Sequence, residues 1–476
     1  MTFVRGCGFR QLPAGLRVWS GFLLVLPAGL GCERFLPDNG LGPSAGGERP
    51  NVIFILTDDQ APNTLGIEGN PIIRTPELDR LAGEGAYFSR AYVPIPQCAP
   101  SRAAILTGLY PHQNGVLRNE DASLRPDAVT FSRLFKQNGY ACGLVGKWHL
   151  GKEDLPQAGF EDLWVTLPLP GEYHDPQLWV NKRLVQTEGY LTDILTDHAI
   201  SFVEKHVDRA FLLWLAYKAP HVPARAPPDP AFAYDAADMV LPPSSADDLS
   251  AKPAAQRDSN GHALYREVGE DEIRRRLSLY YARISSIDHN VGRLVDRLKE
   301  LGLDERTLII FMSDNGVLYG EHQLLRKGAF FYEEVVRSPL IMCWPGRIEP
   351  GTRIDALVSS LDLFPTLCAA VDIPTPEGLA GKELWPLLQS RVSSVHDALF
   401  FEYEATEKPV TMVPVRGLVT ARHKYTKYLE DGEELYDLQV DVHEMRNLID
   451  DPGSRELADR LRAELGAWRT RMGDLQ

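Results

Sequence analysis

Residues 51–59 read NVIFILTDD, a charge-free apolar run that ends on two adjacent carboxylates. Three more short apolar runs follow along the chain, at residues 141–145 (ACGLV), 211–216 (FLLWLA) and 308–312 (LIIFM). Runs of this kind are typical of strands that are buried on both faces, as in a parallel sheet covered by helices. We therefore predict that these runs are strands of one largely parallel sheet.

The segments between these runs carry helical patterns, of which residues 271–301 show the clearest. The apolar residues of this segment repeat at alternating spacings of four and three: Ile273, Leu277, Tyr280, Ile284, Ile287, Val291, Leu294, Leu298 and Leu301. Such a stripe covers one helix face, and Gly302 is a typical stop signal. A coiled coil has the same spacing, but at this length a helix on a sheet is favoured. Alternating strands and helices predict an α/β fold.

Polar side chains follow the predicted strands directly. They are Asp58, Asp59, Lys147, His149, His221, Asp314 and Asn315. Parallel strands end on one edge of the sheet, where ligands bind, so we expect these side chains to meet there. Any single one has an ordinary explanation, because an Asp after a strand is usually a helix cap or a turn residue. The recurrence after four strands favours a functional site.

Oxygen ligands dominate this set. Asp58, Asp59, Asp314 and Asn315 suit a hard cation such as Ca²⁺ or Mg²⁺ rather than structural zinc, because no Cys pair or dense His cluster accompanies them. Three carboxylates gathered without a cation would repel one another and raise their own pKa values. The sequence therefore predicts a divalent metal site.

Cys98 opens a second motif, residues 98–108 (CAPSRAAILTG). Pro100 suits a first helical turn and Gly108 a helix end, which places Cys98 at a helix N-terminus, where backbone N–H groups favour an anion. Arg102 lies about one turn further along and can reach the same group. An isolated Cys is more often a buried structural residue, so this motif alone leaves both interpretations open.

Together these motifs resemble the type I sulfatases, in the order in which that family has them. The matching segments are 98–102 (CAPSR) with 106–108 (LTG), 51–59, 146–151 (GKWHLG), 220–223 (PHVP), 313–316 (SDNG), Lys327 after 320–322 (GEH), and 434–448 (ELYDLQVDVHEMRNL). The resemblance implies an alkaline phosphatase-like fold, with a large mixed, mostly parallel sheet between helices and a smaller C-terminal α+β subdomain. An additional sulfate-contacting Ser of some family members has no clear counterpart.

The resemblance also implies the chemistry. A maturation enzyme oxidises Cys98 to formylglycine, and the hydrated aldehyde provides the hydroxyl that attacks sulfur. Asp58, Asp59, Asp314 and Asn315 would hold Ca²⁺, with Mg²⁺ less favoured, and modified Cys98 would complete the shell. The resemblance also implies roles for five further residues. Arg102 and Lys147 would stabilise the nucleophile and the developing charge, and His149 would act as the base. His221 would protonate the leaving alcohol, and Lys327 would bind sulfate. Glu321 and His322 are candidate substrate contacts.

Three rival functions remain open at this stage. A phosphatase or phosphonate ester hydrolase would use the same scaffold, and a non-catalytic sulfated-glycan-binding protein would keep Cys98 as a thiol. A thiol hydrolase built on Cys98 and a His fits poorly, because it leaves four metal-type ligands unexplained. Among sulfate esters, a sugar O-sulfate is favoured, because export suits the scavenging of extracellular carbohydrate. The sugar, the sulfate position and the oligomeric state are not readable from the sequence.

The N-terminus has the pattern of an export signal. Residues 1–32 combine a basic start with the apolar run 19–30 (WSGFLLVLPAGL), which is too short for a confident membrane span. Lipidation at Cys32 is the alternative to simple cleavage. We predict a Gly/Pro-rich linker at 33–49, a catalytic domain at 50–371 and a C-terminal subdomain at 372–476. No Asn-x-Ser/Thr acceptor occurs, which favours a bacterial periplasmic or secreted protein.

Charge excludes one class of partner. The formal net charge of −15 over 476 residues is a poor electrostatic fit to nucleic acid or to an anionic membrane surface. If the substrate is anionic, it must therefore be attracted locally, by a metal ion and a few Lys, Arg and His side chains at the site.

Overall fold

The fold was analysed in a computed structural model, which describes residues 49–474 except 121, 248 and 406–412. The predicted leader, Cys32 and all but the last residue of the predicted linker lie outside these residues. Of the helices in the described part of the chain, none combines the length and apolar character needed to cross a bilayer.

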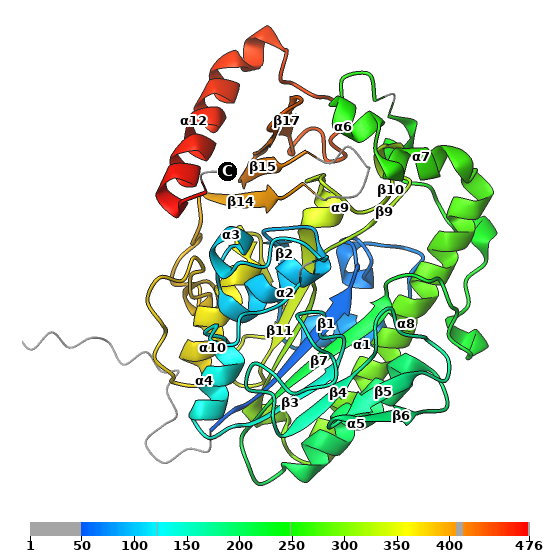
Figure 1. The fold of residues 1–476 in the computed structure, drawn as a ribbon, viewed down its shortest axis with the longest axis vertical. Helices are drawn as coiled ribbons and strands as arrows, with labels where there is room; N and C mark the ends of the chain where they lie inside the picture. Colours follow the sequence, from blue (N-terminus) through cyan, green and yellow to red (C-terminus); the bar gives the residue numbers. More distant parts are fainter. Residues whose placement is uncertain (1–48, 121, 248, 406–412, 475–476) are drawn as a thin grey trace, which may run out of the picture. The chain divides into compact units, whose positions relative to one another are not determined.

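An eleven-stranded mixed sheet forms the centre of the fold (Figure 1). Its middle is parallel, in the order β8 (Thr307–Ser313), β1 (Asn51–Asp58), β7 (Phe211–Pro220), β3 (Ala141–Gly146) and β4 (Leu163–Thr166). The remaining strands flank this middle: β11 (Arg337–Cys343), β2 (Ala86–Tyr92), β12 (Thr352–Ile354), β13 (Val358–Ser359), β5 (Gln177–Val180) and β6 (Arg183–Gln186). The prediction of a mixed, mostly parallel sheet is confirmed.

All four predicted runs form strands, and their side chains alternate between two cores. In β1, Val52, Phe54 and Leu56 belong to the hydrophobic cluster on one face of the sheet. Ile53 and Ile55 belong to the cluster on the other face. Strand side chains point alternately to opposite faces, so a strand that is apolar at every position requires helices on both faces.

Helices cover both faces of the sheet (Figure 1). One face carries α1 (Pro76–Gly83), α5 (Leu191–Lys205) and α8 (Glu270–Glu300). The other carries α2 (Cys98–Thr107), α4 (Phe131–Gln137) and α10 (Leu363–Ala370). Five short helices lie elsewhere in the described chain: α3 (Pro111–Asn114), α6 (Ala254–Arg257), α7 (Asn260–Glu267), α9 (Glu333–Val336) and α11 (Trp385–Leu388). The predicted sandwich of a sheet between helices is therefore observed.

Helix α8 uses its apolar stripe for two purposes. Its second half, with Ile287, Val291 and Leu294, packs on the sheet. Its first half, with Ile273 and Tyr280, packs instead in a separate cluster with β9 (Leu318–Tyr319) and β10 (Leu325–Arg326). The helix therefore continues past the sheet and supports the loops beyond the strand ends.

Residues 221–270 have no sustained apolar period in the sequence, yet the segment is not irregular throughout. Much of it is 3₁₀ turns and coil, but α6 and α7 lie within it. Ser259 caps α7 by accepting the backbone N–H of His262 at 3.2 Å. Only Gly261 of α7 is buried, so this helix has no apolar stripe from which it could be predicted.

The C-terminal part has its own antiparallel sheet of β14 (Ala398–Tyr403), β15 (Val415–Thr420), β16 (His423–Tyr428) and β17 (Glu433–Asp437). Helix α12 (Arg455–Met472) packs on it through Leu461, Leu465 and Trp468. This agrees with the predicted α+β subdomain, whereas its boundary at residue 372 stays a prediction.

Candidate active site at the carboxyl ends of the parallel strands

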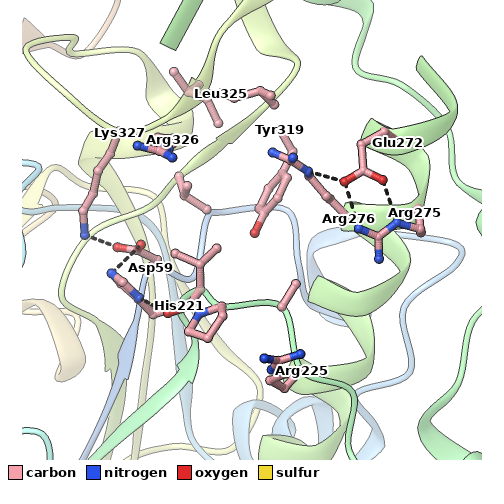
Figure 2. Close-up of a pocket in the computed structure, with 15 residues that line it drawn as sticks. Asp59, His221, Arg225, Glu272, Arg275, Arg276, Tyr319, Leu325, Arg326 and Lys327 are labelled. Carbon is pink, nitrogen blue, oxygen red and sulfur yellow. Dashed lines mark hydrogen bonds and ion pairs between the residues drawn. The ribbon is translucent and has the colours of Figure 1, made fainter. Parts of the chain in front are cut away.

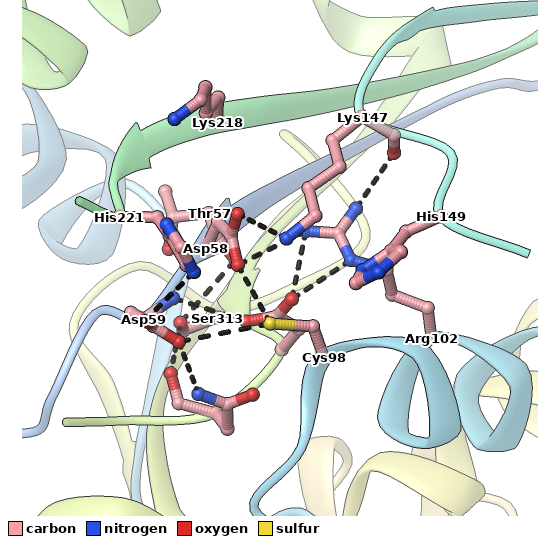
Figure 3. A network of polar contacts seen from close by, with 12 residues as sticks. Thr57, Asp58, Asp59, Cys98, Arg102, Lys147, His149, Lys218, His221 and Ser313 are labelled. Carbon is pink, nitrogen blue, oxygen red and sulfur yellow. Dashed lines mark hydrogen bonds and ion pairs between the residues drawn. The ribbon is translucent and has the colours of Figure 1, made fainter. Parts of the chain in front are cut away.

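The predicted polar residues converge where the parallel strands end (Figure 3). Strands β8, β1, β7 and β3 are consecutive neighbours, so the residues that follow them are adjacent in space. Gly146 ends β3 with a φ of 113°, and a Cβ there would lie 1.9 Å from the carbonyl oxygen of Ala216 on β7. Only glycine allows β3 to run this close to β7 before it turns away, which delivers Lys147 to the cluster.

Cys98 lies at the centre of this cluster, at the start of α2, as predicted. Its Sγ is 3.2 Å from Asp58 Oδ1 and 2.7 Å from Lys327 Nζ. One ligand atom from each of Asp58, Asp59, Cys98 and His221 lies within 4.8 Å of the others, a grouping that can hold a metal ion. Residues at the ends of three elements, β1, β7 and β10, therefore face position 98.

Asp314 and Asn315 enter the same cluster from β8. Asp314 Oδ1 accepts the backbone N–H of Asp59 at 3.2 Å, and Asn315 Nδ2 donates to Asp59 Oδ1 at 2.6 Å. Arg102 Nε donates to Asp314 Oδ2 at 2.9 Å. All four predicted oxygen ligands are at most 5% exposed and are linked directly or through one side chain.

The electrostatics of these carboxylates fit a divalent cation. Burial raises the pKa of Asp314, and the neighbouring Asp58 raises it further, although Arg102 opposes both effects. Burial also works to raise the pKa of Asp58, but Lys147, His221 and Arg102 outweigh it and hold that pKa well below the usual range. The side-chain cations therefore keep one carboxylate ionised but not the second, so the cluster lacks positive charge.

The ammonium of Lys327 stands in for part of that missing charge. Its Nζ contacts Asp59 Oδ1 and lies 3.2 Å from Asn315 Oδ1 and 2.7 Å from Cys98 Sγ. Oxygen atoms that converge on a cation in this way suit Ca²⁺ or Mg²⁺. Lys327 directly follows another basic residue, Arg326, as ordinary surface charges often do, yet its side chain is only 14% exposed and lies in the cluster.

Lys147 and Arg102 form the opposite wall. Lys147 Nζ donates to Asp58 Oδ2 at 2.6 Å, and Arg102 Nη1 donates to the carbonyl oxygen of Lys147 at 2.8 Å. Both side chains are almost fully buried, at 4% and 1% exposure. Buried cations with fixed partners are pre-oriented for a negatively charged group.

His149 follows two residues later with a left-handed φ of 61°. Burial, together with the charges of Lys147 and Arg102, lowers the pKa of His149 to about 2, so its imidazole is neutral. Its backbone N–H donates to Glu153 Oε1 at 3.0 Å, and its Nδ1 is buried without a hydrogen-bond partner in the described structure. Glu153 was not predicted as part of the site, and its spacing of four from His149 is the only sequence signal for it.

His221 approaches from the end of β7. Its Nδ1 is 2.6 Å from the carbonyl oxygen of Val222, a contact that requires a proton on Nδ1 and leaves Nε2 facing Asp59 Oδ2 at 3.6 Å. Burial works to lower the pKa of His221, but Asp58 and Asp59 raise it above the ordinary value.

Two residues that the sequence did not predict hold the loop that carries His221. Tyr173 donates its hydroxyl to the carbonyl oxygen of His221 at 2.6 Å, and Lys218 Nζ donates to that of Val222 at 3.0 Å. Lys218 is 3% exposed, and burial lowers its pKa to about 8.

A cavity of about 660 Å³ opens beside this cluster (Figure 2). Asp59, His221 and Lys327 form its inner side, and residues 222–225 line it as well. The first residues of the segment after His221 therefore form part of the cavity wall. Four arginines that the sequence did not single out also line the cavity: Arg225, Arg275, Arg276 and Arg326.

His322 is not a substrate contact in this structure. Its side chain is fully buried, its ring stacks on Tyr332 with centroids 3.7 Å apart, and its Nδ1 is 2.8 Å from Asp247 Oδ2. The expectation for this residue was wrong, because the tight turn at 321–323 directs its side chain into a polar interior network. Glu321 lines a different cavity, between the catalytic sheet and the C-terminal part.

Comparison with known families gives the identity. The family model described as Sulfatase matches residues 50–373. The chain belongs to the sulfatase family. A second model, described as N-sulphoglucosamine sulphohydrolase, C-terminal, matches residues 320–471 of this sulfatase.

Individual relatives agree with this assignment. The N-acetylglucosamine-6-O-sulfatase of Bacteroides thetaiotaomicron is 30% identical, over 84% of this sulfatase and 83% of the relative. A solved structure in complex with its substrate, D-glucosamine-2-N,6-O-disulfate, superimposes with a TM-score of 0.83 at 27% identity, over 90% of this sulfatase and 99% of that chain.

The alternative functions gain less support. The phosphonate monoester hydrolase of Agrobacterium radiobacter superimposes with a TM-score of 0.75, over 89% of this sulfatase and 96% of that chain, but at 21% identity it shows a shared fold alone. A non-catalytic binding protein has no need of the buried charged cluster around Cys98. The protein is a sulfatase, an enzyme that hydrolyses sulfate esters.

Proposed function

We propose that this sulfatase hydrolyses the O-sulfate of a carbohydrate, with a formylglycine derived from Cys98 and a bound Ca²⁺. One observation carries the proposal: Cys98 Sγ lies 3.2 Å from Asp58 Oδ1 among ligands drawn from β1 and α2. The preference for a sugar is supported by the N-acetylglucosamine-6-O-sulfatase relative and by the substrate of the structural neighbour.

The proposed metal ligands are Asp58, Asp59, Asp314, Asn315 and the modified side chain at position 98. A divalent ion bound there would draw charge off a sulfate oxygen and lower the pKa of an attacking hydroxyl. The hydrated aldehyde would supply that hydroxyl, which a thiol cannot. The buried oxygen atoms around Lys327 Nζ are compatible with this ligand set.

Arg102 and Lys147 are proposed to stabilise negative charge on the nucleophile and on the sulfate. Both are buried and fixed, Arg102 by Asp314 and Lys147 by Asp58. Lys327 is proposed to bind a sulfate oxygen, because it lies between Cys98 and the cavity. Donors that are already oriented need no reorganisation as charge develops.

Two histidines are proposed to move protons. His149 is neutral, because burial and the charges of Lys147 and Arg102 lower the pKa of its imidazole, and its buried Nδ1 has no hydrogen-bond partner among the described residues. It is proposed to accept a proton from a hydroxyl at position 98. His221 presents Nε2 at the boundary between the cluster and the cavity, and its pKa is raised by Asp58 and Asp59. It is therefore proposed to protonate the departing sugar oxygen.

Export to the periplasm or medium is proposed as well, on the basis of the leader at residues 1–32, with lipid anchoring through Cys32 as the alternative. We also keep the proposed division into a linker at 33–49, a catalytic domain at 50–371 and a C-terminal subdomain at 372–476. Cell fractionation and the mass of the mature N-terminus decide the export proposal.

The test compares three preparations of the full chain: expressed with a formylglycine-generating enzyme, expressed without it, and the Cys98→Ala variant. Peptide mass measurement reports the state of residue 98. Turnover is measured on an aryl sulfate, a matched phosphate monoester, a matched phosphonate ester and N-acetylglucosamine-6-O-sulfate. Chelation followed by addition of Ca²⁺ or Mg²⁺ identifies the metal.

We expect sulfate release to follow the fraction of formylglycine and to recover with Ca²⁺ more than with Mg²⁺. Full activity from an unmodified thiol would overturn the mechanism. Faster turnover of the phosphate or phosphonate ester would overturn the proposed reaction and favour the rival function.

A further inference from the structure

We propose that the cavity beside the cluster binds a second anionic group, a sulfate or carboxylate carried by the same substrate molecule. The inference rests on the proposed function, because it assumes that the reacting sulfate ester occupies the cluster. It goes further by assigning the substrate to a chemical class, the dianionic sugars.

The charge of the cavity is opposite to that of the protein. The chain has a formal net charge of −15, yet the cavity is lined by four Arg and one Lys against two carboxylates. Asp59 and Lys327 belong to the end of the cavity next to Cys98, where the reacting sulfate is proposed to bind. Among the remaining lining residues, Glu272 is the one carboxylate facing four guanidinium groups. A basic recess in an acidic protein concentrates anions locally.

Two of these arginines are already neutralised in part. Glu272 binds Arg275 through contacts of 2.6 and 2.8 Å and Arg276 through a contact of 2.8 Å, so one carboxylate serves two guanidinium groups (Figure 2). This group lies across the cavity from Asp59, His221 and Lys327 (Figure 2).

The other two arginines have guanidinium groups without partners among the described residues. Among residues 49–474 as described, no carboxylate or carbonyl group pairs with the side chain of Arg225 or Arg326. Their backbones are nevertheless fixed. The N–H of Arg225 donates to the carbonyl oxygen of Pro223 at 2.9 Å, and Arg326 pairs with Leu318 in the β9–β10 ribbon. Anchored arginines with free guanidinium groups are suited to a carboxylate or sulfate.

The backbone conformation at Arg326 allows both Arg326 and the next residue, Lys327, to line the cavity. Adjacent residues of a regular strand point to opposite faces, but Arg326 and Lys327 both line the cavity. Arg326 has a φ of 75°, in the left-handed region that residues other than glycine rarely adopt. This turn lets Lys327 reach the reacting site while Arg326 remains on the cavity wall.

A further cation lies behind the wall. Arg283 is fully buried in α8, and its Nη1 donates to the carbonyl oxygen of Pro223, a lining residue, at 3.3 Å. Its Nε and Nη2 have no hydrogen-bond partner, and no carboxylate pairs with it in the described part of the structure. A buried cation without a counter-ion is costly, and an anion in the neighbouring cavity would offset part of that cost.

The test measures how well small sugars compete with an aryl sulfate for the matured enzyme. The matched pair is N-acetylglucosamine-6-O-sulfate and glucosamine-2-N,6-O-disulfate, which differ by one anionic group. A 4,5-unsaturated hexuronate-2-O-sulfate distinguishes a carboxylate from a second sulfate, and inorganic sulfate controls for a simple anion effect. The variants are Arg225→Ala, Arg326→Ala, their double variant, and the double variant to Lys.

We expect a dianionic sugar to inhibit at least about 10-fold more strongly than the monosulfated one, as charge-assisted contacts imply. The double Ala variant should remove most of this ratio, and the double Lys variant should retain part of it. Arg183→Ala is the control, because Arg183 is exposed on β6 and lines none of the cavities described above.

Equal inhibition by both sugars, or a ratio that Arg183→Ala lowers as much as the double variant, would overturn the inference. If aryl sulfate turnover persists but the dianionic sugar is not preferred, the inference is wrong while the proposed function stands. Absence of any sulfate release sinks the proposed function, and calorimetric binding of the two sugars to the same protein then decides the inference separately.

Discussion

The two sides of the candidate active site are built differently. The reacting side consists of side chains at the ends of β1, β3 and β8, and Asp58, Asp314 and Arg102 are at most 1% exposed. The recognition side consists of arginines on a loop, on β10 and on α8, of which Arg225, Arg275 and Arg326 are exposed. Buried charges need fixed partners and are costly to disturb, whereas exposed charges are screened by water and salt. Chemistry is therefore expected to depend on the first side and selectivity on the second.

The largest effect is expected at the centre of the buried side. Cys98→Ala should lower sulfate ester turnover by at least about 10⁴-fold, because it removes the nucleophile. Initial rates on an aryl sulfate measure this loss. Cys142→Ala is the matched control, since Cys142 is equally buried but lies at the start of β3, at the opposite end of the strand from the cluster. Comparable losses in both variants would show that the fold, not the nucleophile, is affected.

The next effect concerns the metal ligands. Asp314→Asn should lower kcat/KM by at least about 10²-fold and reduce the rise in Tm that Ca²⁺ gives, because a ligand of the cation is neutralised. Metal content and thermal unfolding with and without Ca²⁺ measure both. Asp127→Asn, at an exposed position, should change neither quantity. An unchanged Ca²⁺ dependence in the Asp314 variant would remove this residue from the ligand set.

A smaller effect is expected at Glu153, which supports the backbone of His149. Burial raises the pKa of Glu153 to about 7, above its ordinary 4.5. The folded state therefore binds the proton more tightly, and stability is lost as pH rises from about 4.5 through 7. Glu153→Gln removes this loss, so the variant should gain on the order of 2 kcal/mol over wild type between pH 5 and pH 8.

Chemical unfolding at the two pH values measures this gain. Glu349→Gln is the control, because Glu349 is exposed. A difference between the Glu153 variant and wild type that does not change with pH would show that this carboxyl group is not perturbed.

The smallest effect concerns salt. Raising NaCl from about 0.05 to 0.5 M should reduce the preference for a dianionic sugar by a few-fold, because exposed guanidinium groups are screened. The rate with a saturating aryl sulfate should change less, because the buried cluster is shielded from salt. Inhibition constants and kcat at the two salt concentrations measure the contrast. Equal salt sensitivity would contradict the division between the two sides.

Much of the reacting side could be predicted from the sequence because it follows from local patterns. An apolar run followed by Asp58 and Asp59 indicates both a buried strand and a polar strand end, and parallel strands bring such ends together. The order of the motifs likewise predicted that Lys147, His149 and Asp314 belong to this side. Glu153 and Lys218 were missed because their roles depend on contacts with backbone groups, which leave at most a weak signal in the sequence, such as the spacing of four between His149 and Glu153.

By itself, the sequence determined the α/β fold, the mostly parallel sheet and the residues at the strand ends, because short-range periodicity and buried-strand composition are written along the chain. Only the tertiary structure showed that the side chain of Lys327 is buried in the cluster, that His322 lies in an interior network, and that Arg225 and Arg326 line one cavity. These outcomes depend on loop conformation, such as the left-handed φ at Arg326, and on contacts between residues far apart in the sequence, such as Lys327 with Cys98 and His322 with Asp247. Such contacts are set by packing in three dimensions, which no local pattern encodes.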